Sequence, residues 1–475
     1  MKTAANADSY TGLGEVNIKI WPDPATPITA DHRLLSLDTV DSLRSRNPVK
    51  ASTSLRDFDL VRVADQVPGG DPRLLRFNLR RRPLFWLAVV TLAAAACSSA
   101  ALEATTTTST TSTTSTTSTV PPTTTTTIPP FTVENAPPEL TAVIEAFYDY
   151  AAGRTTEPPP APEVVVEAIA PADIETPLWG VASVATFKGE GVATVEMEGD
   201  LFLAIGDGSG WRVVGGNWPT LALPAYYGSG PRLVAVVGSD ARPGEDFSRS
   251  RADSIHFVGL DGSGEGAVVG VPRDSYVPVP GIGRRKINAA LALGGPEVMM
   301  QTFRDLTGLP LEGYVLTGFL GFQEMLGNVL GGIDLLIPFA MSDPASGAYF
   351  EAGLQYLNGP NALALARPRK TLAGGDFARS ELQGMILIGA AQNVEIKGHH
   401  VIPGLMELSE PWMLTDLTAE QLLTLSALAI DSDLDAMPNL VAPGRSGWAG
   451  NASVVFLSDS VSALWADLAD GRLDD

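Results

Sequence analysis

The chain has 475 residues, of which 45% are hydrophobic, and its formal net charge is −22. This charge argues against general nucleic-acid binding, because phosphate backbones are bound by basic surfaces. Four histidines and one cysteine argue against a His/Cys zinc site, whereas a metal with oxygen ligands, such as Mg²⁺, stays open. The length allows two or three domains.

The N-terminal residues 1–79 show little hydrophobic periodicity, and we expect them to be disordered or to reflect an over-extended gene start. Residues 80–102 follow the pattern of a signal peptide: three arginines precede an uncharged stretch from Pro83 to Leu102. Cys97 follows three alanines and resembles a bacterial lipoprotein cleavage site, which predicts lipidation at this cysteine.

Two alternatives to the lipoprotein remain for residues 80–102. About 20 uncharged residues can just span a bilayer, so the segment can also be a single transmembrane helix. A buried helix of a soluble domain is the third reading. The first two readings predict that the rest of the chain is anchored at the extracytoplasmic face of a bacterial plasma membrane.

Residues 103–137 are dominated by threonine, serine and proline, and such a tract is expected to be a disordered, extended linker. Residues 138–225 are expected to form a small α+β accessory module with an interaction or spacer role. Pro138–Ala152 has helical hydrophobic spacing. Four alternating runs then predict a four-stranded antiparallel sheet: residues 180–187, 191–197, 201–205 and 211–218.

Residues 231–475 predict an α/β domain with a mixed sheet, divided into a core of residues 231–395 and a C-terminal extension of residues 396–475. Three β-rich runs open it, at residues 233–237, 255–260 and 267–271. Helices are then expected at residues 296–306, 319–330, 360–366 and 377–396, with strands at residues 314–316 and 333–337.

Charged residues follow or precede each of the three opening strands. In an antiparallel meander, the exit of the first strand, the entry of the second and the exit of the third share one sheet edge. Loops at strand ends are where α/β folds place ligands. The residues predicted to converge there are Asp240, Arg251, Asp253 and Arg273.

Further polar residues lie on later elements. Asp376, Arg379 and Gln383 share one helix face by their i, i+3, i+7 spacing, and Asp376 is a candidate N-cap. Clustered arginines are suited to a phosphate ligand, because the guanidinium binds its oxygens through two hydrogen bonds. Paired carboxylates suit Mg²⁺ held between protein and pyrophosphate. The remaining candidates are either Arg285 or its neighbour Arg284, together with Lys286, Asn288, Arg367 and Arg369.

The ordered motifs of this region resemble the LytR–CpsA–Psr family of cell-wall ligases, and the resemblance does not extend to residues 1–230. The matching motifs are Gly238–Arg242, Arg251–Ile255, Val271–Val277, Lys286–Ala290, Gly294–Pro296, Leu330–Ile333, Leu357–Gly359, Ala366–Arg369, and Gly375–Arg379 with Gln383.

The resemblance implies a three-layer α/β/α fold with an apolar tunnel for a polyprenyl chain. It implies transfer of a glycopolymer from a polyprenyl-pyrophosphate carrier to peptidoglycan, with Mg²⁺ held by Asp240 and Asp253. It assigns catalytic roles to Asp240, Arg251, Asp253, Arg273, Arg367 and Arg369, and substrate binding to Arg285, Lys286, Asn288, Asp376, Arg379 and Gln383.

The helices at residues 298–306 and 319–330 are rich in Met, Phe and Leu, which makes them candidate tunnel walls or ordinary core helices. Two other functions stay open beside the ligase. One is a regulatory or scaffold protein that binds polyprenyl pyrophosphate without turning it over. The other is a polyprenyl pyrophosphatase, which uses water as the acceptor.

Overall fold

The computed structural model describes residues 131–174, 177–368 and 372–474. The predicted N-terminal region, the anchor segment with Cys97, most of the linker and Arg369 lie outside the described residues. Within the described residues, no helix combines the length and apolar character that crossing a bilayer requires. All described residues belong to one compact unit, Val120–Asp475.

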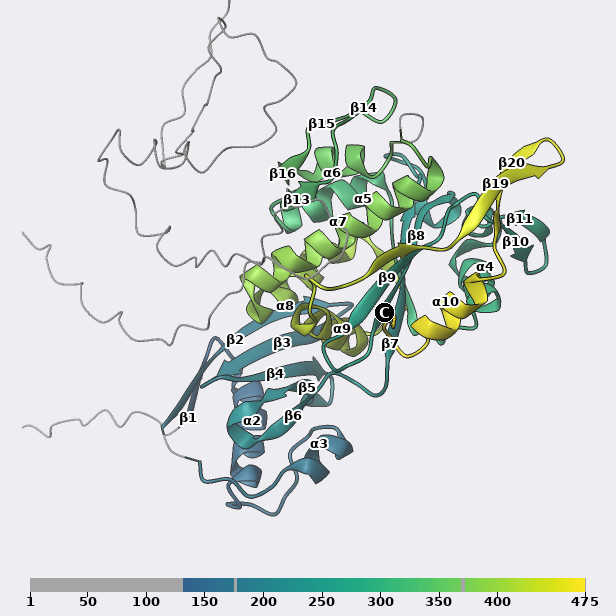
Figure 1. Cartoon of the computed structure of the whole chain (residues 1–475). Coiled ribbons are helices and arrows are strands. Elements are labelled where there is room, and N and C mark those ends of the chain that lie inside the picture. The colour runs from purple at the N-terminus through teal and green to yellow at the C-terminus, as the bar shows by residue number, and fades with distance from the viewer. Residues whose placement is uncertain (1–130, 175–176, 369–371, 475) are drawn as a thin grey trace, which may run out of the picture. The chain divides into compact units, whose positions relative to one another are not determined.

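A six-stranded mixed sheet forms the centre of the larger domain (Figure 1). The predicted meander is confirmed, because its three strands pair antiparallel in chain order. Strands β12 and β18 then add in parallel to β7 and β9, and β17 adds antiparallel to β12. The strands are β7 (Arg232–Ser239), β8 (Ala252–Leu260), β9 (Gly266–Gly270), β12 (Gly313–Thr317), β17 (Leu414–Thr415) and β18 (Asn439–Val441).

Helices cover both faces of this sheet, as side-chain alternation along β8 requires. Phe257 points to one face, where its ring lies 5.4 Å from that of Phe303 and 5.7 Å from that of Trp465. His256 points to the other face and contacts Ser380. The predicted three-layer α/β/α fold is therefore confirmed. The helices are α4 (Ala289–Thr307) and α10 (Val461–Leu468) on the first face, and α7 (Asp376–Lys397) and α9 (Ala419–Asp431) on the second.

Helix α4 corrects one expectation about the tunnel walls. Met299, Met300 and Phe303 are buried in the core of the first face, together with Phe257 and Trp465. The helix is kinked at Gly295, whose φ of 73° favours glycine, and Pro296 starts the longer part. Its apolar residues are core packing, so this helix is not a wall of the cavities described below.

The segments between β12 and α7 form smaller units beside the second face. The helix expected at residues 319–330 is an α-helix followed by a π-helical turn at Met325–Val329. The strand expected at residues 333–337 is present, but it pairs in a separate two-stranded ribbon rather than in the central sheet. The elements are α5 (Phe319–Glu324), β13 (Ile333–Ile337), β14 (Met341–Asp343), β15 (Ala348–Phe350), β16 (Gly353–Leu357) and α6 (Gly359–Leu365).

The α+β module has six strands rather than four. The additional strand β1 pairs parallel to β2 and lies inside the predicted linker, so the ordered module starts earlier than residue 138. Strand β6 pairs with β5 at the other edge. The elements are β1 (Phe131–Glu134), α2 (Pro138–Ala151), α3 (Glu163–Ala168), β2 (Leu178–Phe187), β3 (Glu190–Met197), β4 (Asp200–Asp207), β5 (Gly210–Trp218) and β6 (Leu223–Tyr226).

Both faces of the module's sheet are buried. Helix α2 packs on one face, where the rings of Phe147 and Trp218 stack with centroids 5.4 Å apart. The other face contributes Leu203 and Ile205 to a core shared with Leu423 of α9. A helix α8 (Ile402–Ser409) joins this shared core. The module is therefore built into the larger domain, unlike a spacer.

A buried arginine fixes the junction between module and domain. The Arg232 side chain is 6% exposed and pairs with Glu312, with one Nη2–Oε2 distance of 2.8 Å. The same guanidinium donates to the carbonyl of Tyr227 and to Thr424 Oγ1. Burial without these partners would cost several kcal/mol, so the network specifies this arrangement.

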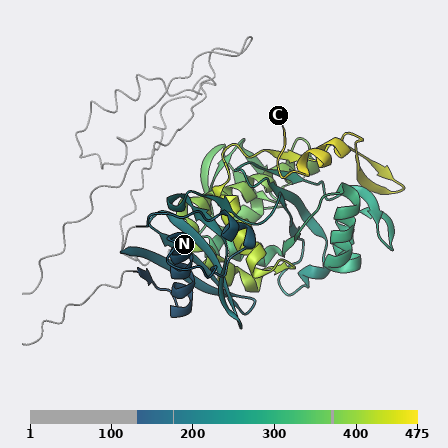
Figure 2. The same cartoon turned by 90° about the horizontal axis from the view of Figure 1, so that it is seen from below.

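The predicted C-terminal extension is an integral part of the fold. Residues 396–475 supply both edge strands of the central sheet, β17 and β18, and helices on both of its faces. They also form a hairpin of β19 (Gly444–Ala449) and β20 (Ala452–Leu457). This hairpin lies beside a second hairpin of β10 (Tyr276–Val279) and β11 (Gly283–Lys286) (Figures 1 and 2).

Candidate active site

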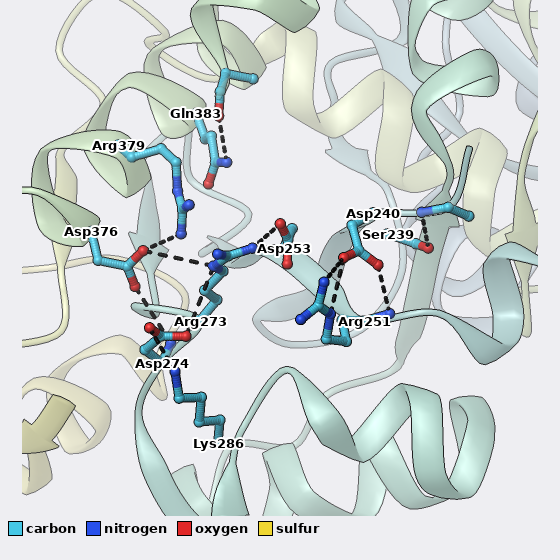
Figure 3. Close-up of polar contacts among 12 residues, drawn as sticks. Ser239, Asp240, Arg251, Asp253, Arg273, Asp274, Lys286, Asp376, Arg379 and Gln383 are labelled. Atoms are coloured by element: carbon cyan, nitrogen blue, oxygen red, sulfur yellow. Dashed lines mark hydrogen bonds and ion pairs between the residues drawn. The ribbon is translucent and has the colours of Figure 1, made fainter. Parts of the chain in front are cut away.

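The predicted sheet edge carries a cavity of about 710 Å³. The four residues predicted to converge from the strand ends, Asp240, Arg251, Asp253 and Arg273, all line it (Figure 3). Arg367 also lines it, and from α7 come Arg379 and Gln383. Sequence and structure therefore place these residues at one site.

Asp240 and Arg251 form a rigid pair at one side of the cavity (Figure 3). Arg251 Nε and Nη2 donate to Asp240 Oδ2 at 3.0 and 2.7 Å, and the Arg251 amide donates to Asp240 Oδ1 at 2.9 Å. The two backbones are joined by a bond from Asp240 N to Arg251 O. The Arg251 side chain is 60% exposed, so it reaches solvent at the cavity rim.

Arg273 is the centre of a second, more buried network. Its side chain is 8% exposed, and Nη1 donates to Asp253 Oδ2. Its Nε lies 3.9 Å from Asp274 Oδ1 and 4.0 Å from Asp376 Oδ1. Three carboxylates around one guanidinium hold it in place, and it still faces the cavity.

Helix α7 carries the next part of the site. Asp376 is its first helical residue, with Gly375 at the N-cap position, so the predicted side-chain cap is wrong. The Asp376 carboxylate instead accepts from Arg379 Nη2 and from the backbone amide of Asp274. One turn further, Gln383 Nε2 donates to the carbonyl of Ala366 at 2.8 Å, which fixes the amide orientation. Asp376 thus orients two arginines without lining the cavity.

Arg367 directly follows Ala366, the residue to which Gln383 is bonded, and lines the same cavity. Its guanidinium carbon is 4.7 Å from the ring centroid of Phe319, a cation–π distance. Within the described residues, no acidic side chain lies at ion-pair distance from Arg367. Its charge is therefore available to a ligand in the cavity.

Besides Asp376, three other predicted substrate-binding residues do not line this cavity. Lys286 pairs with Asp274, one of the carboxylates around Arg273, at 3.0 Å, but it does not line the cavity. Arg285 is exposed on β11. Asn288 is buried, and its backbone joins Arg273 to Ala252 through two hydrogen bonds, which is a structural role.

Residues that sequence reasoning did not single out also line the cavity. Arg242 adds a fifth arginine to Arg251, Arg273, Arg367 and Arg379, in a chain of net charge −22. Arg242 ends the Gly238–Arg242 motif, but one surface arginine does not by itself indicate a binding site. Asp343 and Ser346 come from the β14–β15 turn, far from any end of a central strand, so strand order could not reveal them.

The inner part of the cavity is apolar. Its lining includes Phe319 and Phe322 of α5, and Ile386 and Leu387 of α7. A second cavity of about 250 Å³ continues along the same two segments, lined by Met325, Leu330, Ala390, Ala391 and Val394, with further side chains from α8 and α9. The helix expected at residues 319–330 thus lines both cavities.

A buried histidine determines the hydrogen-bond polarity of Ser254 at the cavity wall. His256 is fully buried, and its Nε2 lies 2.9 Å from the carbonyl oxygen of Ser380. A carbonyl can only accept, so Nε2 carries the proton and Nδ1 accepts from Ser254 Oγ at 3.2 Å. Ser254 Oγ therefore keeps its lone pairs for the cavity that it lines.

Acidification is expected to destabilise the protein through His256. Burial lowers the pKa of His256 from 6.5 to about 4, because the charged imidazolium loses its hydration. Between these values the unfolded chain binds a proton that the folded chain does not. Stability is therefore lost as the pH falls from 6.5 to 4, by about 3 kcal/mol in total. Denaturant unfolding of the wild type and of His256→Gln across this range checks it; parallel curves would contradict it.

Asp253 fits a metal-binding role better than Asp240. Its Oδ1 is buried and has no hydrogen-bond partner, so one oxygen is free for a cation. Both oxygens of Asp240 are already occupied by Arg251. Within the described residues, no group of three or more His, Cys, Asp or Glu side chains could hold a metal ion. Mg²⁺ at this site would thus need phosphate oxygens and water as further ligands.

Comparison with known proteins identifies the family. Residues 222–470, just over half of the chain, match the family model described as the LytR_cpsA_psr family. The chain belongs to the LytR–CpsA–Psr family. This LytR–CpsA–Psr match starts near the end of the module and includes both the cavity residues and the C-terminal strands.

Two curated relatives of this LytR–CpsA–Psr chain illustrate the similarity. It is 37% identical over 151 residues to the probable cell wall biosynthesis protein LcpB of Corynebacterium glutamicum, covering 29% of this chain and 36% of the relative. It is 36% identical over 156 residues to the polyisoprenyl-teichoic acid–peptidoglycan teichoic acid transferase TagV of Bacillus subtilis, covering 30% and 40%. The matched segments thus span well under two thirds of these relatives.

Solved structures of similar proteins include the crystal structure of B. subtilis TagV. The likeness covers 51% of this LytR–CpsA–Psr chain and 98% of TagV, with 25% sequence identity and a TM-score of 0.43. A structure of TagT bound to LI-WTA is 19% identical, covers 52% and 92% of the two chains, and has a TM-score of 0.43.

Proposed function

We propose that this protein is a phosphotransferase that moves a glycopolymer from a polyprenyl-pyrophosphate carrier to peptidoglycan. The observation that carries the proposal is one cavity that combines five arginines with an apolar inner wall. A lipid pyrophosphate has this same division into a polyanionic head and an apolar chain. The family membership and the activity for which the TagV relative is named support the same reaction.

The polar part of the cavity is assigned to the pyrophosphate. Arg273 and Arg379, held by Asp376, and Arg367, stacked on Phe319, would hold its oxygens. Their geometry is fixed before the ligand arrives, so little reorganisation is needed when charge develops in the transition state. Arg251 at the rim would contact the same head group from the opposite side. Positioning and charge neutralisation are the main requirements of phosphoryl transfer.

The apolar part of the cavity is assigned to the polyprenyl chain. The chain would run between α5 and α7 toward the second cavity, past Phe322 and Ile386 to Met325 and Val394. Burial of apolar surface supplies affinity at this end, at roughly 25 cal/mol per Å². The protein thus binds the carrier through two chemically different parts of one site.

The reaction makes one bond and breaks one. The acceptor hydroxyl oxygen attacks the phosphorus that carries the glycan, and the bond from this phosphorus to the bridging oxygen breaks. Polyprenyl phosphate leaves and takes up the proton that the hydroxyl loses, and a phosphodiester joins the glycopolymer to peptidoglycan. Asp253 would hold Mg²⁺ through its free Oδ1, and the ion supplies neutralisation of the pyrophosphate charge when bound, whereas Asp240 would orient Arg251. Ser254 Oγ can accept a hydrogen bond from the attacking hydroxyl.

The proposal places the site outside the cytoplasm. Peptidoglycan lies there, and the segment of residues 80–102 fits an anchor by lipid at Cys97 or by a single helix. A threonine-rich linker between anchor and module would let the domain reach the wall from the membrane.

Polyprenyl-pyrophosphate-linked glycan, incubated with the protein and Mg²⁺, is expected to release polyprenyl phosphate. Product bound to added peptidoglycan identifies the ligase. Release with water alone as acceptor identifies a pyrophosphatase. Tight binding with no release in either case would overturn both enzymatic functions and leave a regulatory or scaffold protein.

Asp253→Asn is expected to lower this release about 100-fold, because it removes one charge next to the Arg273 guanidinium and the free oxygen suited to Mg²⁺. Release rates at increasing Mg²⁺ concentration measure the effect. The unfolding temperature of the variant serves as the control for folding. A variant with unchanged rate and unchanged Mg²⁺ dependence would remove Asp253 from the site.

A further inference from the structure

Two hairpins project side by side from the larger domain (Figures 1 and 2). They are the β10–β11 and β19–β20 hairpins, joined where the Val455 amide donates to the Asp274 carbonyl at 2.8 Å and Ser275 bridges Val455. Asp274 directly follows Arg273, which lines the cavity. The hairpins therefore meet next to a residue of the site.

Four side chains form a row across the two hairpins. The rings of Tyr276 and Phe456 lie edge to face, with centroids 6.2 Å apart. Arg284 lies 5.9 Å from the Tyr276 ring centroid, and Arg445 lies 5.5 Å from that of Phe456. Both arginines are exposed, and both rings are partly exposed. We call these four residues, Arg284, Tyr276, Phe456 and Arg445, the cation–aromatic row.

The charge of this surface is opposite to that of the whole chain. Residues 276–286 and 444–457 contain four cationic residues and no Asp or Glu, although the chain has 54 acidic and 32 basic residues. Lys286 is paired with Asp274. Arg284, Arg285 and Arg445 make no ion pair with any residue in the described part of the chain. Their charges are therefore available to an anionic partner.

We propose that the cation–aromatic row binds the acceptor glycan strand, peptidoglycan. The proposal rests on the function proposed above and names the surface that presents the acceptor hydroxyl. Aromatic rings stack on the apolar faces of sugar rings and keep a rigid shape at low entropic cost. Arginine forks bind carboxylates through two hydrogen bonds, and the peptide stems of peptidoglycan carry carboxylates. A row of two rings between two arginines offers both contacts along one strand.

The position of the row favours the acceptor over the glycan of the donor. In phosphoryl transfer the attacking and leaving oxygens lie roughly in line on opposite sides of phosphorus. Gln383 and Lys286 lie on opposite sides of Arg273 (Figure 3). Gln383 belongs to the α7 wall that continues into the apolar part, toward which the lipid phosphate leaves. The acceptor then enters from the Lys286 side, where the hairpins begin.

Co-sedimentation of the full chain with insoluble peptidoglycan, stripped of attached polymers by acid, tests the proposal without requiring turnover. The wild type is expected to sediment with it, and Arg284→Glu/Arg445→Glu is expected to bind about tenfold more weakly. The matched control is Arg154→Glu/Arg212→Glu, which changes the net charge equally at two exposed side chains of the module: Arg154 pairs with Asp149 and donates to the Ile174 carbonyl, and Arg212 pairs with Glu420. A third variant, Tyr276→Leu, removes one ring while keeping an apolar side chain.

The outcomes separate this inference from the proposed function. Weaker binding by the row variants, with binding retained by the control, supports the acceptor surface. Equal loss in both double variants would indicate general charge repulsion and overturn it, as would a wild type that does not sediment. If the row variants lose binding only to soluble poly(glycerol phosphate) and still bind peptidoglycan, the row belongs to the donor polymer instead. Failure of the proposed function shows separately, as absent polyprenyl phosphate release by the wild type.

Discussion

Arg367→Ala is expected to lower polyprenyl phosphate release about 10³-fold while the protein stays folded. An arginine that neutralises transition-state charge in phosphoryl transfer typically contributes a factor of 10³–10⁵. Arg367 contacts the ring of Phe319 and, among the described residues, has no acidic partner. Its removal therefore leaves no buried carboxylate unpaired. The measurement is kcat/KM for release, together with the thermal unfolding temperature.

Two further variants sharpen this prediction. Arg367→Lys keeps the charge and loses the planar fork, so partial recovery is expected. Arg212→Ala, on the exposed surface of the module, should leave kcat/KM unchanged. If Arg367→Ala turns over at the wild-type rate, the guanidinium beside Phe319 does not hold the pyrophosphate.

A fragment of residues 231–475 is expected to be insoluble or to lack fixed tertiary packing. The residues that this fragment lacks supply seven buried side chains to the core shared with α8 and α9: six from the module, among them Leu203 and Ile205, and Tyr227 just after it. Each such side chain contributes roughly 1.5–3 kcal/mol on burial. Their sum is comparable to the whole stability of a typical domain, about 5–15 kcal/mol.

The matched control is the fragment of residues 131–475, which keeps this shared core complete. It is expected to unfold cooperatively, at the same temperature as the full chain. Circular dichroism in the near ultraviolet and binding of a hydrophobic dye compare the two fragments. A cooperative unfolding transition in residues 231–475 at an unchanged temperature would show that the module is an independent domain after all.

The sequence predicted the site well where strand order alone decides geometry. Asp240, Arg251, Asp253 and Arg273 follow from one assumption, an antiparallel meander, because such a meander brings their strand ends to one edge. The spacing of Arg379 and Gln383 similarly needs only the helical period. Arg285 lies away from the cavity because of how β10 pairs with β11. The local sequence pattern does not predict this pairing.

The relation between module and domain could not be predicted from pattern. Some strands of the module alternate between apolar and polar residues, and others are apolar on both faces. The sequence of a strand that is buried on both faces does not tell which elements cover it. Only the structure shows that Leu423 and Met406, some 200 residues later, cover its second face. The strand at Phe131–Glu134 was missed because it follows a threonine-rich tract directly and has only four residues.

The late position of the two edge strands has a consequence for how the molecule acquires its structure. Strands β17 and β18, which flank the central sheet, come from residues 414–441. Pairings so distant in sequence fold slowly, since the long intervening loop must close first. Until these residues have been synthesised, β12 and β9 present unpaired edges that invite association with other chains. The function proposed above requires transport across the membrane, and this delay would keep the domain unfolded, and thus able to pass through a translocation channel, until almost its last segment has emerged.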